Sequence, residues 1–589
     1  MGEVSLREQL LELLMLDIRC FGVDDTGKPV PQTILDHLVG NFLMNYPIGG
    51  VILFQENLNT PEQIIKLTTQ LQQHSHHGRL IAIDEEGGVV SRIPGNLETV
   101  GNMALGVIDD INATKACANV IGMQLSMLGI NLNLAPVVDV NSNPDNPIIG
   151  VRSFGSDPKL VARHGVAFIE GLQQQGVLAC AKHFPGHGDT NTDTHLAQAC
   201  VTHSLDEFEQ IELPPFQAAI AADVDCIMVA HIAAPALDNT QVYSTKQQKS
   251  IPTPATFSHP IVTELLRKQL IFNGVIISDA LDMQAISAYF DPVTATVLSL
   301  KAGIDLIVMP VKIWTDADIF AFDNYFNAVY QACVADMALG LHIREAYSRV
   351  INLKHKLGQK CMHRDSRVVI ASGAWQSMFN AQINNAQRIM LDKKLVVYQQ
   401  SLAKRAITVY RDDKKYLPLH LREQDRILVM GNKQILVDNV VADVKDLLNA
   451  ADAKQPVGSL DCSLDSMSRV AQVESFCVDY TQLGEKTTTD IISWIQDYTH
   501  IIILTYNLTQ AEAEVNKIFS VLNDLNKPYV MLSCRNPYDI RYTPDASTVI
   551  FAYGATGFDQ TNYKIKKFTL NIRAALGVFG VLTRNRINF

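Results

Sequence analysis

Short apolar runs alternate with longer amphipathic stretches along the first half of the chain. Eight runs are rich in Val, Ile and Leu and lack strict apolar–polar alternation, which is typical of parallel strands buried on both faces. They span residues 15–21, 49–54, 80–85, 130–138, 177–183, 226–231, 275–279 and 304–309. The stretches between them, such as 61–74 and 261–269, have helical spacing and length. This alternation predicts an α/β fold, a (β/α)8 TIM barrel.

A second pattern follows the barrel. Residues 351–404 are helical and polar in pattern, which suits a connector. Five more strand-like runs, at 406–410, 426–430, 501–505, 529–533 and 548–552, are separated by helical stretches. We therefore expect a barrel over 1–350, a helical connector over 351–404 and a smaller αβα sandwich domain over 405–589. Gly431 alone after a strand is no dinucleotide fingerprint, so no cofactor is expected there.

The polar residues of the barrel runs stand where the runs end. A charged or imidazole side chain closes five of them: Asp84 and Glu85, Asp139, Lys182 and His183, His231, and Asp279. Packing gives a core strand no reason to finish repeatedly on such a side chain. Because the carboxyl ends of the strands form the active face of a (β/α)8 barrel, the pattern predicts a functional mouth.

The bulk composition excludes several classes of protein. The 589 residues are 47% hydrophobic and 19% charged, as in a globular protein of at least two domains. A formal charge of −12 and the lack of a basic stripe argue against a nucleic-acid partner. No apolar run is long enough to predict a membrane span. Residues 1–21 carry acidic and basic side chains among their leucines, which predicts an amphipathic helix and not a signal peptide.

The ten cysteines form no CxxC pair. Five of them, Cys20, Cys117, Cys180, Cys200 and Cys226, fall in or beside apolar runs, so we expect buried free thiols. Free thiols favour a reducing compartment, and a cytoplasmic location follows. A periplasmic or secreted protein whose leader had been removed would look the same.

The most specific chemistry begins at the end of the fifth barrel run. Four residues separate the segment Lys182-His183-Phe184-Pro185-Gly186-His187-Gly188 from Asp193-Thr194-His195. Proline and glycine force a tight, irregular loop. If Asp193 and His195 lie on extended backbone, they face the same way, and the carboxylate can hold one imidazole nitrogen. The other nitrogen is then free to exchange protons as a general acid or base.

Asp279 ends the apolar run 275–279, where it could act as a nucleophile at the barrel mouth. A neighbouring Lys182 or Arg152 could keep its carboxylate ionised. The competing interpretation is an aspartate that caps the following helix. Spacing alone favours neither interpretation.

Five further residues could bind a polyhydroxylated ligand through charge-assisted hydrogen bonds: Asp84, Arg92, Arg152, Lys182 and His183. For each of them a surface ion pair is the structural alternative, most of all for Arg92. The same region also admits a metal site, built from His183, His187, Asp189, Asp193 and His195. Because only the solitary His231 would complement that cluster at another strand end, we expect no metal.

These motifs resemble glycoside hydrolase family 3, and within it the N-acetyl-β-glucosaminidases of peptidoglycan turnover. The signature from Lys182 to His195 matches at every fixed position. Supporting matches lie at 83–88 with Arg92, at 151–155, at 228–231 and at 278–283. Weaker matches at 406–410, 417–419 and 535–539 resemble the family's αβα sandwich, which we expect to be structural or an accessory wall.

The resemblance implies a role for each residue. Asp279 would be the nucleophile, and His195 the acid/base with Asp193 as its partner. The other residues, Asp84, Arg92, Arg152, Lys182 and His183, would bind the sugar. Most retaining glycosidases use a second carboxylate as acid/base, and family members acting on glucose or xylose take a glutamate from the second domain. The intact Asp193-Thr194-His195 segment therefore favours the glucosaminidase branch.

The expected reaction is hydrolysis of terminal β-linked N-acetylglucosamine from muropeptides or chitooligosaccharides. Three alternatives stay open. The chain could be a family 3 glucosidase or xylosidase. It could be a phosphorylase, since an imidazole does not repel incoming phosphate as a carboxylate would. It could also be an inactive barrel that binds cell-wall fragments.

Overall fold

The computed structural model describes residues 4–190 apart from 74, 76 and 96, then 199–362, 392–417, 425–452, 472–553 apart from 536, and the short pieces 556–559, 564–567 and 575. The chain divides into two compact units. One comprises Met1–Leu97 and Asp109–Val396, and the other comprises Glu98–Ile108 and Val397–Phe589. The predicted boundaries at 350 and 404 stay a prediction, and much of the connector, 363–391, lies outside the described residues.

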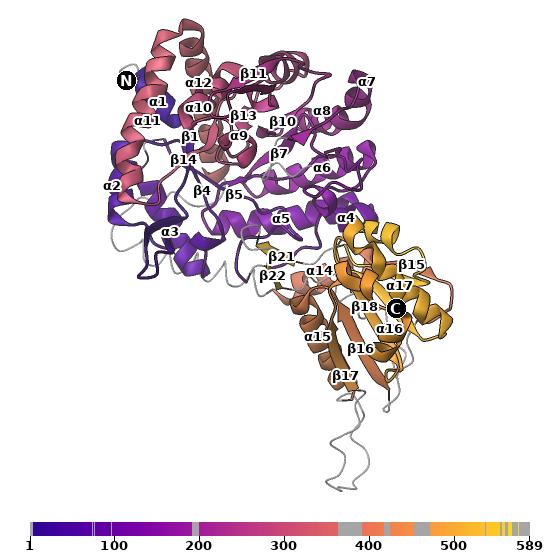
Figure 1. The fold of residues 1–589 in the computed structure, drawn as a ribbon. Helices are drawn as coiled ribbons and strands as arrows, with labels where there is room; N and C mark the ends of the chain where they lie inside the picture. Colours follow the sequence, from indigo (N-terminus) through magenta and orange to yellow (C-terminus); the bar gives the residue numbers. More distant parts are fainter. Residues whose placement is uncertain are drawn as a thin grey trace. The chain divides into compact units, whose positions relative to one another are not determined.

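Eight parallel strands form the sheet of the first unit, in the order β13-β9-β7-β6-β5-β4-β1-β14 (Figure 1). A parallel bridge between Ile277 and Leu306 joins its two end strands, so that the sheet closes on itself. The predicted (β/α)8 barrel is confirmed, and each apolar run overlaps one of the barrel strands. The strands are β1 (Leu14–Asp17), β4 (Gly50–Ile52), β5 (Leu80–Ile83), β6 (Leu132–Asn133), β7 (Leu178–Phe184), β9 (Cys226–Val229), β13 (Val275–Ser278) and β14 (Ile307–Lys312).

The barrel strands are buried on both faces, which explains their continuous apolar runs. Every residue of β1, β4, β5, β6, β7, β9 and β13 is buried. Strand β14 begins three residues later than the run at 304–309. The reason is that the amides of Asp305 and Leu306 both donate to the carbonyl of Ile276 on β13 before the ladder with β1 begins.

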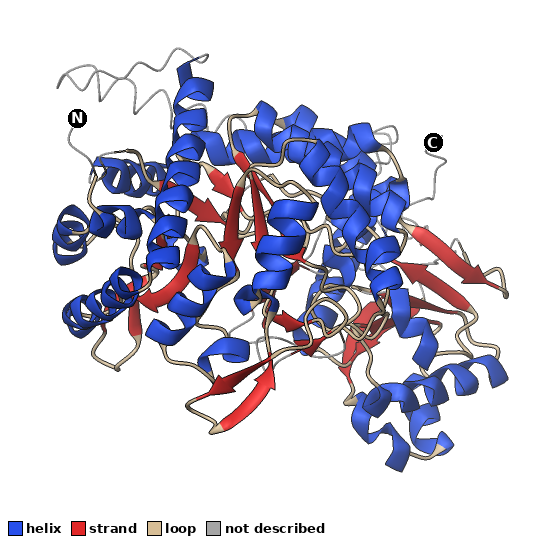
Figure 2. Cartoon of the chain, turned by 90° about the horizontal axis from the view of Figure 1, so that it is seen from above, coloured by secondary structure: helices blue, strands red, loops and turns tan. Residues whose placement is uncertain are grey.

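Helices connect the barrel strands, and Figure 2 shows them flanking the sheet. The predicted helix at 61–74 is α3 (Pro61–Gln73), and the stretch at 261–269 forms a π-helix, Pro260–Gln269. Aspartates fix several starts, because the side chains of Asp110, Asp157 and Asp291 accept hydrogen bonds from first-turn amides. The remaining long helices are α1 (Leu6–Glu12), α2 (His37–Asn45), α5 (Ile111–Met127), α6 (Pro158–Gln174), α8 (Leu213–Ala221), α10 (Pro292–Ala302), α11 (Asp316–Ala335) and α12 (Met337–Met362).

The second unit contains a six-stranded sheet in the order β15-β20-β19-β18-β16-β17. Strand β15 is antiparallel to its neighbour, and the other five are mutually parallel. The five predicted runs correspond to β15 (Thr408–Asp412), β16 (Arg426–Gly431), β18 (His500–Thr505), β19 (Tyr529–Ser533) and β20 (Thr548–Phe551). The sequence pattern missed β17 (Gln472–Cys477), because this edge strand is largely exposed and polar.

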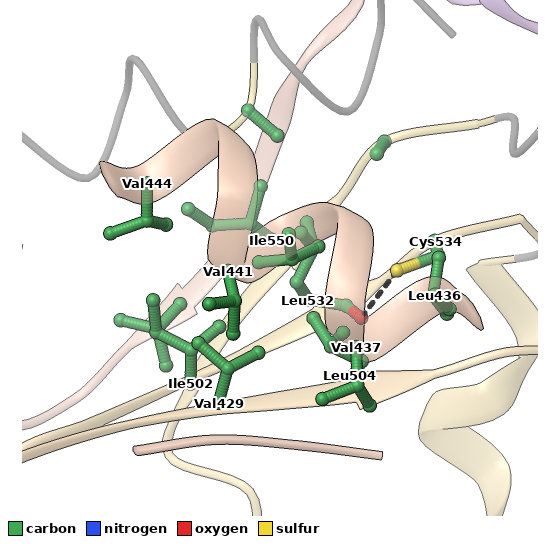
Figure 3. Packing of buried hydrophobic residues seen from close by; sticks show 14 of the residues in the cluster. Val429, Leu436, Val437, Val441, Val444, Ile502, Leu504, Leu532, Cys534 and Ile550 are labelled. Carbon is green, nitrogen blue, oxygen red and sulfur yellow. Dashed lines mark hydrogen bonds between the residues drawn. The ribbon is translucent and has the colours of Figure 1, made fainter. Parts of the chain in front are cut away.

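Helix α15 (Gln434–Asp452) supplies much of the core of this unit. Leu436, Val437, Val441 and Val444 from the helix join buried aliphatic residues of the sheet in one cluster (Figure 3). The sheet contributes Val429, Ile502, Leu504, Leu532 and Ile550. The thiol of Cys534 donates to the carbonyl of Leu532 at 3.5 Å. Burial of this apolar area is what holds helix and sheet together.

The expectation of buried thiols is confirmed for Cys20, Cys117, Cys180 and Cys226, and it is wrong for Cys200. Cys200 is the second residue of β8 (Ala199–Cys200), a two-residue strand in which Ala199 is buried and Cys200 is exposed. Successive side chains on a strand point in opposite directions. A cysteine next to an apolar residue is therefore not necessarily buried itself.

Among the described residues, no helix combines the length and apolar character needed to cross a bilayer.

A buried ion pair joins α12 to α1. The Nζ atom of Lys354 lies 2.5 Å from Oε2 of Glu12, and both side chains are almost completely buried. Lys354→Met should lower the free energy of unfolding by about 3 kcal/mol, because it leaves the Glu12 carboxylate buried without this partner.

Urea denaturation of the two variants Lys354→Met and Lys268→Met tests this. Lys268 pairs with Glu264 at 2.8 Å but is 61% exposed, so its loss should cost less than about 0.5 kcal/mol. Similar small losses in both variants would contradict a structural role for the buried pair.

Candidate active site

Three of the predicted binding residues meet in one ion-pair network at the carboxyl end of the barrel. The Lys182 Nζ atom lies 2.7 Å from Oδ1 of Asp84 and 2.7 Å from Oε1 of Glu86. Arg152 donates to the two oxygens of Glu86 through Nε at 2.9 Å and through a terminal nitrogen at 2.8 Å. Two cations and two carboxylates therefore balance one another beside the ends of β5 and β7.

The network stays charged although it is buried. Burial alone would lower the pKa of Lys182, but the charges of Asp84 and Glu86 outweigh this effect and raise it. Burial would likewise raise the pKa of Glu86, yet Arg152 and Lys182 hold it well below its usual value. The pKa of Arg152 is raised, because the attraction of Glu86 exceeds the cost of burial. The side chains thus form a fixed array of ionic donors and acceptors.

Glu86 is a member of this array that sequence reasoning missed. It follows Asp84 and Glu85 directly, and nothing in the three consecutive acids shows which of them faces the ligand side. The structure separates them at the Gly87-Gly88 turn. The Glu85 carboxylate accepts the backbone amides of Arg92 at 2.7 Å and Ile93 at 3.3 Å, so it braces the turn instead.

His183 also lies at this end, held by a second missed residue, Asp139. Oδ2 of Asp139 lies 2.7 Å from His183 Nδ1, and Oδ1 accepts the amides of His183 at 3.1 Å and His187 at 2.8 Å. Burial pushes the pKa of Asp139 up, but the neighbouring imidazole charge and these hydrogen bonds lower it overall. The sequence did mark Asp139 as a polar strand end; only the fold pairs it with His183.

The turn after β7 is packed too tightly for larger residues. A side chain at Gly186 would overlap the carboxyl group of Glu212, and one at Gly188 would overlap the carbonyl of Val140. Asn146 fixes the turn from the outside, because its amide donates to the carbonyls of His187 at 2.8 Å and Gly188 at 3.0 Å. The peptide bonds Lys182–His183 and Phe184–Pro185 are cis.

His187 serves this turn rather than the charge network. Its Nδ1 atom lies 2.7 Å from the hydroxyl of Thr190. Burial lowers the pKa of His187 to about 4, with a smaller effect from the charge of His183. His187 is therefore a neutral imidazole at neutral pH.

Asp193 and His195 lie outside the described residues, and their pairing stays a prediction.

Asp279 follows directly after β13, two strands from β7 in the sheet. Its amide donates to the carbonyl of Val229 at 3.0 Å, and its Oδ1 accepts the amide of Ala280 at 2.8 Å. The helix-cap interpretation of Asp279 is wrong, because the next helix, α9 (Gln284–Ser287), begins after Met283. His231, two residues after β9, contacts this segment, with Nε2 2.9 Å from the carbonyl oxygen of Ala280.

Arg92 is not part of the charge network. Its side chain is half-buried, and its Nε atom has no hydrogen-bond partner in the part of the chain that the structure describes. Its backbone amide, by contrast, is used by Glu85.

The predicted metal alternative depends partly on Asp193 and His195. In the described segments, no three His, Cys, Asp or Glu side chains converge as metal ligands would. Because two members of the proposed cluster are not among those segments, that alternative is tested by chelation below.

Comparison with known proteins adds independent findings. Residues 5–353 match the glycosyl hydrolase family 3 N terminal domain. The chain is 38% identical over 444 residues to a protein named β-hexosaminidase A of Pseudoalteromonas piscicida, covering 72% of this chain and 70% of that one. It is 26% identical over 513 residues to a β-N-acetylglucosaminidase/β-glucosidase of Cellulomonas fimi, covering 86% and 84%. A family 3 β-N-acetylglucosaminidase structure from Paenibacillus sp. superposes with a TM-score of 0.74 at 25% identity, covering 98% and 97%.

The Glu85 carboxyl gives a pH-dependent stability. Burial raises its pKa from 4.5 to about 7, although hydrogen bonds from Ser91 and from the amides of Arg92 and Ile93 oppose the shift. Between those two values the folded chain keeps a proton that the unfolded chain has lost, so stability falls as pH rises through this window. Glu85→Gln removes the titration, so its stability relative to the wild type should rise by on the order of 3 kcal/mol from pH 4.5 to pH 8.

Denaturation midpoints at several pH values measure this difference. The matched control is Glu62→Gln on α3, because Glu62 is exposed to water in the folded state. A Glu85→Gln difference that does not change with pH would show that Glu85 does not titrate in this range.

Proposed function

Because the chain belongs to glycosyl hydrolase family 3, we propose that it is a retaining, exo-acting β-N-acetylglucosaminidase. Its proposed substrates are GlcNAc-containing fragments of peptidoglycan. The relatives named above support the amino-sugar specificity, since two of them carry β-N-acetylglucosaminidase in their names and a third is named β-hexosaminidase. The observation that carries the proposal is the largely buried array of Asp84, Glu86, Arg152 and Lys182 at the same barrel end as Asp279.

The array suits a terminal sugar. Asp84 is 21% exposed and can accept hydrogen bonds from hydroxyl groups, while the ammonium of Lys182 can donate to a sugar oxygen. Glu86 holds both Lys182 and Arg152 in place, so little side-chain freedom is lost on binding. His183, with its Nδ1 turned to Asp139, keeps Nε2 for the sugar.

In the proposed reaction the Asp279 carboxylate attacks the anomeric carbon. His195, in its protonated form, gives its proton to the leaving oxygen, and the glycosidic bond breaks to leave a glycosyl-enzyme ester. Neutral His195 then takes a proton from water, whose oxygen attacks the same carbon and releases Asp279. The sugar leaves with retained configuration. Asp193 would orient the imidazole and raise its basicity, which places the activity maximum near neutral pH.

A second imidazole competes for the role of acid. His183 and Asp139 form a buried imidazole–carboxylate pair, with 2.7 Å between Nδ1 and Oδ2. Its Asp139 partner also accepts two backbone amides, which suits a fixed binding group more than a group that exchanges protons. Kinetics with different leaving groups separates the two histidines.

Asp279→Ala should lower kcat by at least about 10⁴-fold on every substrate, because both steps pass through this carboxylate.

His195→Ala should lower kcat about 10²- to 10⁴-fold on chitobiose, whose leaving group needs a proton, and far less on nitrophenyl N-acetylglucosaminide. His183→Ala should raise KM on both substrates alike. Equal losses on both substrates for His195→Ala would remove it as the acid.

The substrate class is tested with nitrophenyl glycosides. We expect nitrophenyl N-acetylglucosaminide to be turned over at least about 100-fold faster than the glucoside, and turnover to be unaffected by a chelator. A preferred glucoside would establish the glucosidase alternative, and a loss with chelator would establish the metal-dependent one. Sugar 1-phosphate formed in phosphate buffer would establish phosphorolysis, and no turnover at all would leave a binding protein.

We further propose that the enzyme acts in the cytoplasm. The buried free thiols of Cys117, Cys180 and Cys226 support this location. Cell fractionation with an antibody to the chain tests it.

A further inference from the structure

A histidine outside the charge network bridges the two ends of the segment that carries Asp193 and His195. Asp189 lies just before that segment, in the turn after β7, and His203 lies just after it, three residues beyond β8. The Nε2 atom of His203 is 3.3 Å from Oδ2 of Asp189. The His203 side chain is 11% exposed and that of Asp189 is 27% exposed, so the contact is largely shielded from water.

The other ring nitrogen of His203 faces a buried acid. Nδ1 is 3.6 Å from Oε1 of Glu212, the last residue of the π-helix Phe208–Glu212. Glu212 has no exposed surface. Within the segments that the structure describes, neither of its carboxyl oxygens has a hydrogen-bond partner, and the same holds for His203 Nδ1. Two orphaned polar atoms facing each other in a protein interior cost several kcal/mol unless they interact. Such a cost is typical of a functional site and not of plain packing.

Glu212 also touches the turn itself. Its carboxyl group fills the space beside the α-carbon of Gly186, where any larger residue would overlap it. Gly186 has φ of +128°, a conformation that favours glycine. The acid therefore lies between the turn and His203, and it contacts both.

We propose that His203 and Glu212 are positioning residues, which hold Asp189 and thereby fix the two ends of the segment that carries the acid/base pair. The inference rests on the proposed function, because the contacts matter for catalysis only if Asp193 and His195 are the acid/base pair. A general acid displaced by about 1 Å can lose on the order of 10²-fold in rate, so the ends of a short segment matter for catalysis.

The surroundings of Glu212 determine its protonation state and hence its contact with His203. Burial raises the pKa of Glu212 well above its usual value, and the carboxylates of Asp139 and Asp189 raise it further. An uncharged Glu212 can donate its O–H to Nδ1 of His203, and His203 can then donate Nε2–H to the Asp189 carboxylate. An approach of roughly half an ångström brings the first of these pairs into hydrogen-bond range.

Two variants test the proposal without removing any group that touches substrate. His203→Phe keeps an aromatic ring against Phe208, whose centroid lies 5.8 Å from that of His203, but removes both nitrogens. Glu212→Leu keeps a side chain of similar size and removes the orphaned oxygens. Both should lose about 10- to 100-fold in kcat on chitobiose but less than about 3-fold on nitrophenyl N-acetylglucosaminide, with KM nearly unchanged.

Stability separates positioning from packing. Glu212→Leu removes a buried acid whose oxygens make no hydrogen bond within the described residues, so its Tm should equal or exceed that of the wild type while its chitobiose activity falls. The conservative Glu212→Gln, which keeps an uncharged donor, should restore the wild-type ratio of the two activities. His259→Phe is the matched control, since His259 pairs with Glu264 at 3.7 Å on the surface and should change neither activity.

Equal losses on both substrates together with a lowered Tm would reduce His203 and Glu212 to packing residues and overturn the proposal, as would wild-type kinetics in both variants. If His203→Phe does not fold, Asp189→Asn replaces it with the same expected ratio. Should the wild type turn over neither substrate, or His195→Ala show no dependence on the leaving group, the proposed function fails and the positioning role with it. An active wild type with a leaving-group effect at His195 but none at His203 and Glu212 defeats only the positioning role.

Discussion

The double contact of Lys182 with Asp84 and Glu86 is the interaction on which the barrel mouth depends. A lysine with almost no exposed surface stays charged only if carboxylates lie against it, and here two do so at 2.7 Å. Glu86 in turn stays ionised because Arg152 shares it. Each member therefore requires the others, and the requirement fixes three chain segments, after β5, before α6 and along β7, at one point.

The turn after β7 meets a different constraint, one of space. Gly186 and Gly188 allow Glu212 and the carbonyl of Val140 to approach the backbone more closely than a β-carbon would permit. Asp139 and Asn146 then satisfy the amides and carbonyls that this tight path exposes. Strand β7 carries Lys182 of the charge network and leads directly into the turn. A residue that fixes the position of the network therefore also constrains the position of the turn.

Much of the fold was predictable, because burial on both faces leaves a signature that is local in sequence. Runs such as 177–183 and 275–279 are continuously apolar because neither face of the strand meets water. The edge strand β17 was missed for the converse reason: most of its side chains are exposed to solvent, so its sequence is not a continuous apolar run. Cys200 escaped for a third reason: the direction of one side chain on a two-residue strand depends on register, which the sequence does not display.

The candidate site likewise has features that the sequence shows and features that only the tertiary structure shows. By itself the sequence determined that a barrel carries Asp84, Lys182, His183 and Asp279 at strand ends, since chain order and strand direction suffice for that. Only the tertiary structure decided that Glu86 and not Glu85 joins Lys182, that Asp139 holds His183, and that His203 reaches Asp189 and Glu212. The physical reason is that the protonation state and orientation of a buried charged side chain depend on all of the groups around it. Those neighbours, such as Glu86 and Arg152, lie far apart in sequence and meet only when the barrel closes.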